Sequence, residues 1–408
     1  MALFIFYQGL IAFALFLVLW NYRRNLRDFL YLRHFENGEP PLKPFVSVLI
    51  PARNEERNIL RLIKSLLSQD YDHLEIIVLD DQSTDRTKEI LERLKEQNAG
   101  KRIKILEGKA LPKGWMGKNY ACHQLAQEAQ GEILLFLDAD TWLAPRAIRS
   151  GLSALYETQS DFLSLLPTEV TGTLWEKMII PFMHFAPMCL LPFRLIRTSP
   201  NPLISMAVGQ FMMFRKSAYS KIGGHASVKG EVVEDIMLAR RVKEFGLMPL
   251  FLDGNSLVFC RMYRNLKEVW LGFSKFLFAV FQFHLLPLLL VMGIFDALFL
   301  FPFFYLLRIF LGADYPLLGE ILIFLQVMAI IWLRLRHSLR FQSKGDVLLH
   351  PFAMIHINFI ALFSVFLHLS GIGVIWKGRK YRTVAGEEPT FDSEEEENTA
   401  PFNFHSKV

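Results

Sequence analysis

Hydrophobic and polar positions divide the chain into a first apolar helix, a middle region of short alternating segments, and a second apolar region. Residues 2–20 carry no charged side chain, and this length is about what a helix needs to cross a hydrocarbon core of ~30 Å. Arg23, Arg24 and Arg27 follow directly, which by the positive-inside rule places the downstream region in the cytoplasm. A cleaved signal peptide is the alternative, but a basic start and a small-residue cleavage site are missing. We therefore expect residues 1–22 to form a retained transmembrane anchor.

Residues 45–263 alternate short β-rich runs with amphipathic stretches, a pattern typical of an α/β domain. The runs Val46–Ile50 and Ile133–Leu137 contain almost no polar position, as expected for strands covered on both faces of a mostly parallel sheet. The predicted strands are Phe45–Ile50, Leu74–Leu79, Ile103–Glu107, Ile133–Leu137, Phe162–Leu166, Phe211–Phe214 and Leu250–Leu252. The predicted helices are Arg57–Ser68, Thr84–Gln97, Asn119–Ala129 and Glu234–Phe245.

Residues 264–383 become membrane-like again, with predicted spans at Leu285–Leu307, Tyr315–Leu333 and within Leu348–Trp376. The basic loop at 334–344 should be cytoplasmic, which three earlier crossings satisfy. A fourth crossing would then export the basic group at 377–382, against the same rule. Either the last segment is re-entrant or the rule fails here, so the side of the C-terminus stays open.

Polar residues in the apolar regions need partners. Asp296 lies near the middle of a predicted span, where a charge is costly and functional by default, and its partner is not evident. Gln326, His356, Asn358 and His368 are interpreted as interhelical hydrogen-bonding groups. Residues 178–195 are apolar but interrupted by Pro181, Pro187 and Pro192. They fit an interfacial segment along the membrane, or else a buried part of the α/β domain.

Composition supports a membrane protein of 408 residues, because 52% of them are hydrophobic and 37 are Phe. Collagen-like and wholly disordered chains are excluded. Residues 384–408 contain seven acids and one lysine, so the rest carries 44 Lys and Arg against 33 Asp and Glu, a surplus suited to an anionic membrane surface. The acidic tail is predicted to be disordered. Three widely spaced cysteines, Cys122, Cys189 and Cys260, argue against a disulfide framework and a structural zinc site.

Acidic side chains follow three of the predicted strands. Glu55 comes after the first, the pair Asp80 and Asp81 after the second, and Asp138 and Asp140 after the fourth. Because parallel strands deliver their carboxyl ends to one edge, these acids should converge there, although turns and helix caps also use such residues. Converging carboxylates repel each other unless a cation lies among them. Hard oxygen ligands favour Mg²⁺ or Mn²⁺ shared with substrate phosphates.

The order Pro51-Ala-Arg-Asn-Glu-Glu, Asp80-Asp-x-Ser-x-Asp-x-Thr, Asp138-x-Asp140, Glu234-Asp235 resembles the family 2 inverting glycosyltransferases with a GT-A fold, over residues 45–260. This resemblance implies a nucleoside-diphosphate sugar donor. It implies that the donor's base and ribose are bound by Pro51, Ala52, Arg53, Asn54, Glu55, Asp80 and Asp81. It further implies that Asp138 and Asp140 hold a metal bridging the diphosphate, and that Asp235 is the general base.

The stretch Lys113-Gly-Trp-Met-Gly-Lys-Asn119 is similar to a donor-site loop of membrane-bound members of this family. The resemblance implies that Lys118 and Asn119 belong to the donor site, with Lys118 neutralising phosphate. A surface lysine before a helix is the rival interpretation. Glu234 is included among the substrate-binding residues beside Asp235. Both acids could instead complement the positive end of the helix that follows them.

Processive relatives share a Gln-x-x-Arg-Trp motif that is replaced here by Val269-Trp-Leu-Gly-Phe-Ser-Lys-Phe276. That departure favours transfer of a single hexose. The interfacial segment beside the site and the spans that follow it favour a lipid acceptor, and the expected donor is a uridine-linked sugar. The overall layout resembles bacterial membrane glycosyltransferases acting on carotenoid acids such as diaponeurosporenoate, and hopanoid-type and ceramide-type relatives. The alternatives are a processive polysaccharide synthase and a non-catalytic nucleotide-binding scaffold; no nucleic acid partner is expected. The sugar, the acceptor, its hydroxyl or carboxylate group and the oligomeric state stay open.

Overall fold

The computed structural model describes residues 1–40, 43–98, 102–341, 347–382 and 390–392. Its central element is a seven-stranded sheet in the order β3-β2-β1-β4-β8-β6-β9. The strands are β1 (Val46–Ala52), β2 (Leu74–Asp80), β3 (Ile103–Glu107), β4 (Ile133–Leu137), β6 (Phe162–Leu166), β8 (Phe211–Arg215) and β9 (Pro249–Asp253). Only β8 runs antiparallel to its neighbours within this sheet. The predicted α/β class with a mostly parallel sheet is confirmed.

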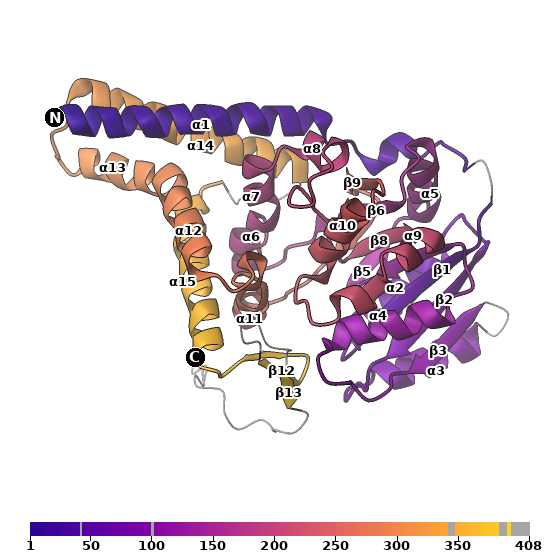
Figure 1. Ribbon diagram of the computed structural model, residues 1–408. Helices are drawn as coiled ribbons and strands as arrows, with labels where there is room; N and C mark the ends of the chain where they lie inside the picture. Colours follow the sequence, from indigo (N-terminus) through magenta and orange to yellow (C-terminus); the bar gives the residue numbers. More distant parts are fainter. Residues whose placement is uncertain (41–42, 99–101, 342–346, 383–389, 393–408) are drawn as a thin grey trace.

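Helices cover both faces of this sheet (Figure 1). One face packs against α2 (Ile59–Leu67), α3 (Thr87–Gln97) and α5 (Ala147–Glu157), and the other against α4 (Gly117–Glu128), α9 (Lys216–Lys221) and α10 (Glu234–Glu244). Successive strand residues point to opposite faces. Val48 and Ile50 therefore join the first core and Leu49 the second. This explains why β1 shows no alternation of polar and apolar residues.

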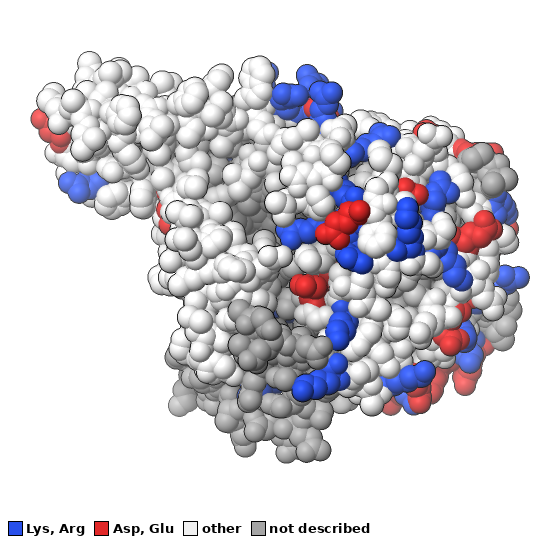
Figure 2. Space-filling model, viewed as in Figure 1, with Lys and Arg blue, Asp and Glu red and all other residues white. Residues whose placement is uncertain are grey.

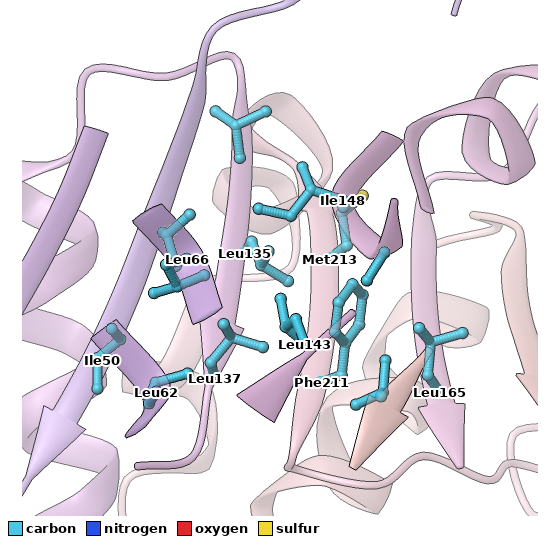
Figure 3. Packing of buried hydrophobic residues seen from close by; sticks show 14 of the residues in the cluster. Ile50, Leu62, Leu66, Leu135, Leu137, Leu143, Ile148, Leu165, Phe211 and Met213 are labelled. Atoms are coloured by element: carbon cyan, nitrogen blue, oxygen red, sulfur yellow. The ribbon is translucent and has the colours of Figure 1, made fainter. Parts of the chain in front are cut away.

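The first core is formed by branched aliphatic side chains that interlock between the sheet and α2 (Figure 3). Leu62 and Leu66 of α2 pack beside Leu135 of β4, and all three are almost fully buried. Burying such a side chain contributes about 1.5–3 kcal/mol. The polar loops at the carboxyl ends of β1, β2 and β4 are thus carried on a rigid base.

Two small sheets flank the domain. One joins β5 (Thr141–Leu143), β10 (Val258–Cys260) and β7 (Thr168–Glu169). The other joins β11 (Val374–Trp376), β12 (Arg379–Arg382) and β13 (Thr390–Asp392). β13 lies within the acidic tail that was predicted to be disordered, so these three residues differ from that prediction. The remainder of the tail lies outside the described residues.

Four stretches within the described residues have the length and apolarity of membrane spans: α1 (Ala2–Asp28), the pair α12 (Leu285–Phe299) and α13 (Phe301–Phe310), α14 (Leu317–Phe341) and α15 (His350–Leu369). The break between α12 and α13 falls just before Pro302, which has no backbone N–H to continue a helix. In Figure 1, α1 and α14 lie side by side, whereas α12 and α15 run together across their direction.

Residues 178–195, predicted as an interfacial segment, form the end of α6 (Leu174–Ile179), α7 (Phe182–Leu190) and the start of α8 (Phe193–Thr198). The last carbonyls of α7 have no partner inside the helix. Asn25 of α1 donates to Leu191 O at 2.6 Å and to Met188 O at 2.9 Å, and Asn21 donates to Cys189 O at 2.9 Å. These bonds fix the broken apolar segment against α1.

Two of the four polar groups predicted to pair between the apolar helices, Gln326 and Asn358, do so. Gln326 of α14 donates to Gln8 O of α1 at 2.9 Å. Asn358 of α15 donates to Asp296 Oδ1 of α12 at 2.7 Å, which identifies the partner that the sequence did not reveal. His356 instead bonds to a carbonyl of its own helix, and the ring of His368 stacks on Phe283.

Candidate active site

A cavity of about 1120 Å³ lies between the carboxyl edge of the sheet and the apolar helices. Its polar half contains most of the residues predicted from the sequence: Pro51, Ala52, Arg53, Asn54, Glu55, Asp81, Lys118, Asp138, Asp140, Glu234 and Asp235. Asp80 and Asn119 are the two predicted site residues outside this lining. In Figure 2, charged side chains gather over the α/β domain and around the hollow beside it, whereas the surface of the apolar helices is nearly uncharged.

The loops after β1 and β2 are tied together by short hydrogen bonds. Asn54 accepts from Thr84 N at 2.8 Å, and Glu55 N donates to Thr87 Oγ1 at 2.7 Å. Asn54 has φ +53°, in the left-handed region that Asn tolerates better than most residues. Arg53 donates to Asp81 O at 2.5 Å. The two loops therefore form one preformed rim at the edge of the cavity.

Asp80 and Asp81 differ in position although both are buried. Asp81 lines the cavity and accepts two bonds from the guanidinium of Arg379, one of them at 2.9 Å. Burial raises the pKa of Asp81 even though Arg379 favours its ionised form. Asp80 is directed into the turn, where its carboxylate faces Ser83 N at 3.4 Å. Only the second acid of the pair is thus presented to a ligand in the cavity.

Lys118 bridges two acids of the site, Asp138 after β4 and Glu234 at the start of α10. Its Nζ lies 2.7 Å from Asp138 Oδ1 and 2.8 Å from Glu234 Oε1. Burial works to lower the pKa of Lys118, but the two carboxylates hold that pKa well above its ordinary value. A Cβ at Gly209 would lie 2.8 Å from Lys118 Nζ, so a larger residue there would displace the ammonium group from its present position. Lys118 is a firmly held cation among the acids and not a free surface lysine.

Asp235 begins α10 beside Lys118 and Glu234. Its Oδ2 accepts from Gly209 N at 3.0 Å and its Oδ1 from Ile236 N at 2.8 Å. Burial, reinforced by the charge of Glu234, raises the pKa of Asp235 to about 7. A carboxylate with a pKa near neutrality can exchange a proton with a substrate at physiological pH. Helix capping explains part of this arrangement but not the raised pKa.

Asp138 and Asp140 both line the cavity, from the turn that follows β4 and not from the strand itself. Burial and the charge of Asp138 raise the pKa of Asp140 to about 7. Asp140 Oδ1 is buried without a hydrogen-bond partner among the described residues, as expected of an oxygen that a cation can occupy. No three His, Cys, Asp or Glu side chains in the described ranges are grouped to hold a metal by themselves. These hard oxygen donors fit Mg²⁺ or Mn²⁺ completed by substrate phosphates.

Asn119 supports the site from behind the cavity. Its side-chain amide donates to the carbonyls of Val228, Lys229 and Glu231 at 2.8, 3.2 and 2.9 Å. These bonds fix the loop that leads into Asp235. Its place in the predicted donor motif therefore corresponds to positioning a neighbouring loop.

Several cavity residues were not predicted as site residues. Lys275 of α11 (Leu266–Phe276) lines the cavity within the electrostatic reach of Glu234, Asp138 and Asp235, and burial lowers its pKa. Lys377 binds Glu55 at 2.9 Å and also lines the cavity. Nothing in the local sequence pattern around either lysine indicates that the chain returns to the acids at that point.

The other half of the cavity is apolar and is formed by helices from distant parts of the chain. Its lining includes Phe182 and Met183 of α7, Val291 and Phe295 of α12, and Met354, Ile357 and Ala361 of α15. The carboxylates and this apolar wall therefore belong to one continuous space. A ligand with a polar head and a hydrocarbon body fits both halves.

Comparison with known proteins agrees with this geometry. Residues 47–223 match the family described as "Glycosyl transferase family 2". The chain is 30% identical over 235 residues to a 4,4'-diaponeurosporenoate glycosyltransferase of Staphylococcus haemolyticus, covering 57% of this chain and 60% of that protein. The Staphylococcus aureus protein of the same name is 28% identical, with 55% and 59% covered. The chain thus spans less than two thirds of these relatives.

Among solved structures, the mannosyltransferase PcManGT from Pyrobaculum calidifontis, in complex with GDP-Man and Mn²⁺, superposes with a TM-score of 0.53 at 15% identity. That alignment covers 90% of this chain and 98% of the other. At this identity the likeness concerns the fold alone. Residues 47–223 of this chain are therefore similar to the family 2 glycosyltransferases, and its α/β fold resembles that of PcManGT.

Proposed function

We propose that the chain is a membrane-bound inverting glycosyltransferase that moves one hexose from a uridine-linked nucleoside-diphosphate sugar to an apolar acceptor. The observation that carries this proposal is the single cavity shared by the acidic set and the apolar helices. The relatives named for diaponeurosporenoate support an acceptor such as a carotenoid acid. The nucleotide sugar and Mn²⁺ bound to PcManGT support the donor class.

In this proposal the rim loops with Asp81 bind the nucleotide, and Lys118 faces the diphosphate. The acceptor oxygen attacks the anomeric carbon from the side opposite the diphosphate, and the bond from that carbon to the phosphate oxygen breaks. Asp235 takes the proton of an acceptor hydroxyl, contributing on the order of 10²–10⁴ in rate. An acceptor carboxylate has already lost its proton, so Asp235 would then orient it. Closing the cavity with apolar side chains keeps water from the sugar.

Asp138 and Asp140 are the residues that would hold a divalent cation, and Mg²⁺ or Mn²⁺ there would stabilise the charge of the leaving diphosphate. Lys118 already neutralises Asp138 and Glu234 in this arrangement. Lys118 is therefore positioned to turn toward a phosphate that offers it a stronger partner.

The apolar wall weighs against the processive alternative. A growing polysaccharide needs a channel lined with polar groups, whereas α7, α12 and α15 line this cavity with Phe, Met, Val and Ile. An acceptor carrying a long hydrocarbon body matches that lining. The absence of the Gln-x-x-Arg-Trp motif after Asp235 points in the same direction.

The proposal is tested by incubating membranes that contain the protein with labelled nucleotide sugars and Mg²⁺ or Mn²⁺, followed by lipid extraction and mass spectrometry. We expect one hexose added to an extractable lipid from one nucleotide sugar of the panel. Label recovered in a long water-soluble polymer would support the processive alternative. Nucleotide binding without any transfer would support the scaffold.

A further inference from the structure

The two chain segments on either side of α15 both contact the glycosyltransferase domain. On the first side, Arg340 near the end of α14 binds Asp253 at the end of β9, with Nε 2.8 Å from Oδ2. The same guanidinium donates to Phe29 O at 2.6 Å, and Arg340 O accepts from Asn255 at 2.7 Å. The end of α14 is therefore fixed to the domain side of the membrane.

On the other side, β11 and β12 return to the rim of the cavity. Arg379 pairs with Asp81 inside the domain, and both residues are buried. Lys377 Nζ lies 2.9 Å from Glu55 Oε1, and Lys377 O accepts from Arg53 Nε at 2.8 Å. Removing one partner of a buried ion pair would leave the other charge buried without compensation, so this contact is not an incidental one.

A chain segment that leaves and rejoins the same side of a membrane crosses it an even number of times. Between Arg340 and Lys377, α15 is the one candidate span in the described part of the chain. A single helix that crossed would place its two flanks on opposite sides, which these contacts forbid. α15 therefore has the length and composition of a membrane span, but its two flanking segments lie on the same side of the membrane.

The outward face of α15 is apolar and exposed, which indicates a hydrocarbon environment. Apolar side chains recur at intervals of three and four residues along it and are 40–71% exposed: Phe352, Ile355, Phe359, Leu362, Phe366 and Leu369. The opposite face carries Met354, Ile357 and Ala361 into the cavity. The neighbouring faces of α1 and α14 are similarly apolar. Figure 1 shows α15 running beside α12 and across α1 and α14, as a helix lying in the plane of a leaflet would.

We propose that α15 lies embedded in the leaflet that faces the glycosyltransferase domain and does not cross the bilayer. Its outward apolar face contacts acyl chains, and its inward face forms the wall through which a membrane-dissolved molecule reaches the cavity. The basic group at 377–382 then stays on the domain side, which removes the conflict with the positive-inside rule. This inference goes beyond sugar transfer and does not depend on it.

The test uses single cysteines in the full-length protein, labelled with a membrane-impermeant maleimide in sealed vesicles of known orientation. The native Cys122, Cys189 and Cys260 are buried and give the background. Ser370→Cys, an exposed position just after α15, is the probe, and Arg336→Cys marks the end of α14. Lys88→Cys marks the domain side. Asp314→Cys marks the far side, because the neighbouring Tyr315 stacks on Phe4 at the start of α1.

We expect Ser370→Cys and Arg336→Cys to label from the same side as Lys88→Cys, and Asp314→Cys from the opposite side. Labelling of Ser370→Cys from the side that labels Asp314→Cys would overturn the proposal. If lipid shields Ser370→Cys from both sides, a C-terminal fluorescent protein fusion decides. Such a fusion fluoresces when the C-terminus shares the cytoplasm with the domain, and it stays dark if α15 crosses.

Discussion

At the scale of single residues, Asp235 has the most specific role. It lies in the cavity with its carboxylate oriented by Gly209 N and Ile236 N. Asp235→Asn keeps the size of the side chain and removes the basic oxygen. With a hydroxyl acceptor we expect kcat to fall by on the order of 10²–10⁴ while the KM for the donor changes little. Steady-state kinetics with labelled donor measure this.

The matched control is Glu89→Gln, an exposed acid on α3 that does not line the cavity. It removes the same charge from the protein and should leave kcat unchanged. Equal loss in both variants would show that net charge, and not the base, determines the rate. Full activity of Asp235→Asn would remove Asp235 from the chemistry.

The raised pKa of Asp235 predicts how activity changes with pH, and a pH profile can test this prediction. Because a base must be ionised and this carboxyl has a pKa of about 7, the active fraction falls as pH drops below that value. We expect kcat/KM for a hydroxyl acceptor to decrease about tenfold per pH unit below neutrality. A flat profile between pH 5 and pH 7 would contradict the base role and would indicate an acceptor that is already ionised.

At the scale of elements, the main strands were predictable because each apolar run is bounded by polar residues. α5 was not predicted, although Ile148, Leu152 and Leu155 recur on it at helical spacing. The small buried residues between them, Ser150, Gly151 and Ser153, interrupt that pattern. A Cβ at Gly151 would lie 3.0 Å from Met213 Cε, so tight packing on the sheet selects those residues. The short strands β5, β7 and β10 depend on distant partners and leave no local pattern.

The candidate site was predictable to the extent that strand ends deliver it. Asp81, Asp138 and Asp140 meet in one cavity because β2 and β4 are parallel and share an edge, whereas Asp235 is brought there by the start of α10. The different orientations of Asp80 and Asp81 were not predictable, because adjacent acids look alike in a sequence. The positions of Lys377 and Arg379 in the site were not predictable either. Their partners, Glu55 and Asp81, lie about 300 residues earlier in the chain, and no local sequence pattern marks the return of the C-terminal strand.

The packing of α11 provides a prediction about an element. A Cβ at Gly272 would lie 2.2 Å from the ring and hydroxyl of buried Tyr263. Gly272→Ala should therefore displace α11, which carries Lys275, and cost about 1–3 kcal/mol of stability. Gly293→Ala in α12 is the control, because nothing lies within 4 Å of its added Cβ. It should be neutral or gain up to about 1 kcal/mol. Thermal unfolding in detergent distinguishes them, and equal melting temperatures would contradict the packing.

At the scale of the whole molecule, the apolar wall of the cavity includes α12 and α15, which begin at residues 285 and 350, far along the chain from the anchor. Substitutions in this wall therefore test the overall arrangement. Ile357→Trp adds a large ring on the inward face of α15 and should lower transfer to a lipid acceptor at least tenfold without changing nucleotide binding. Phe359→Trp, two positions away and 59% exposed, makes a similar change on the outward face and should have little effect. Equal activities would place the acceptor elsewhere.

The most direct test of a single cavity shared by the carboxylates and the apolar helices is a structure of the protein in a lipid disc with uridine diphosphate and Mn²⁺. The account predicts the uracil and ribose at the rim near Asp81, density for Mn²⁺ beside Asp138 and Asp140, and lipid density along Ile357 that reaches toward Asp235. Nucleotide bound away from these carboxylates, or a protein wall separating Asp235 from α15, would contradict it.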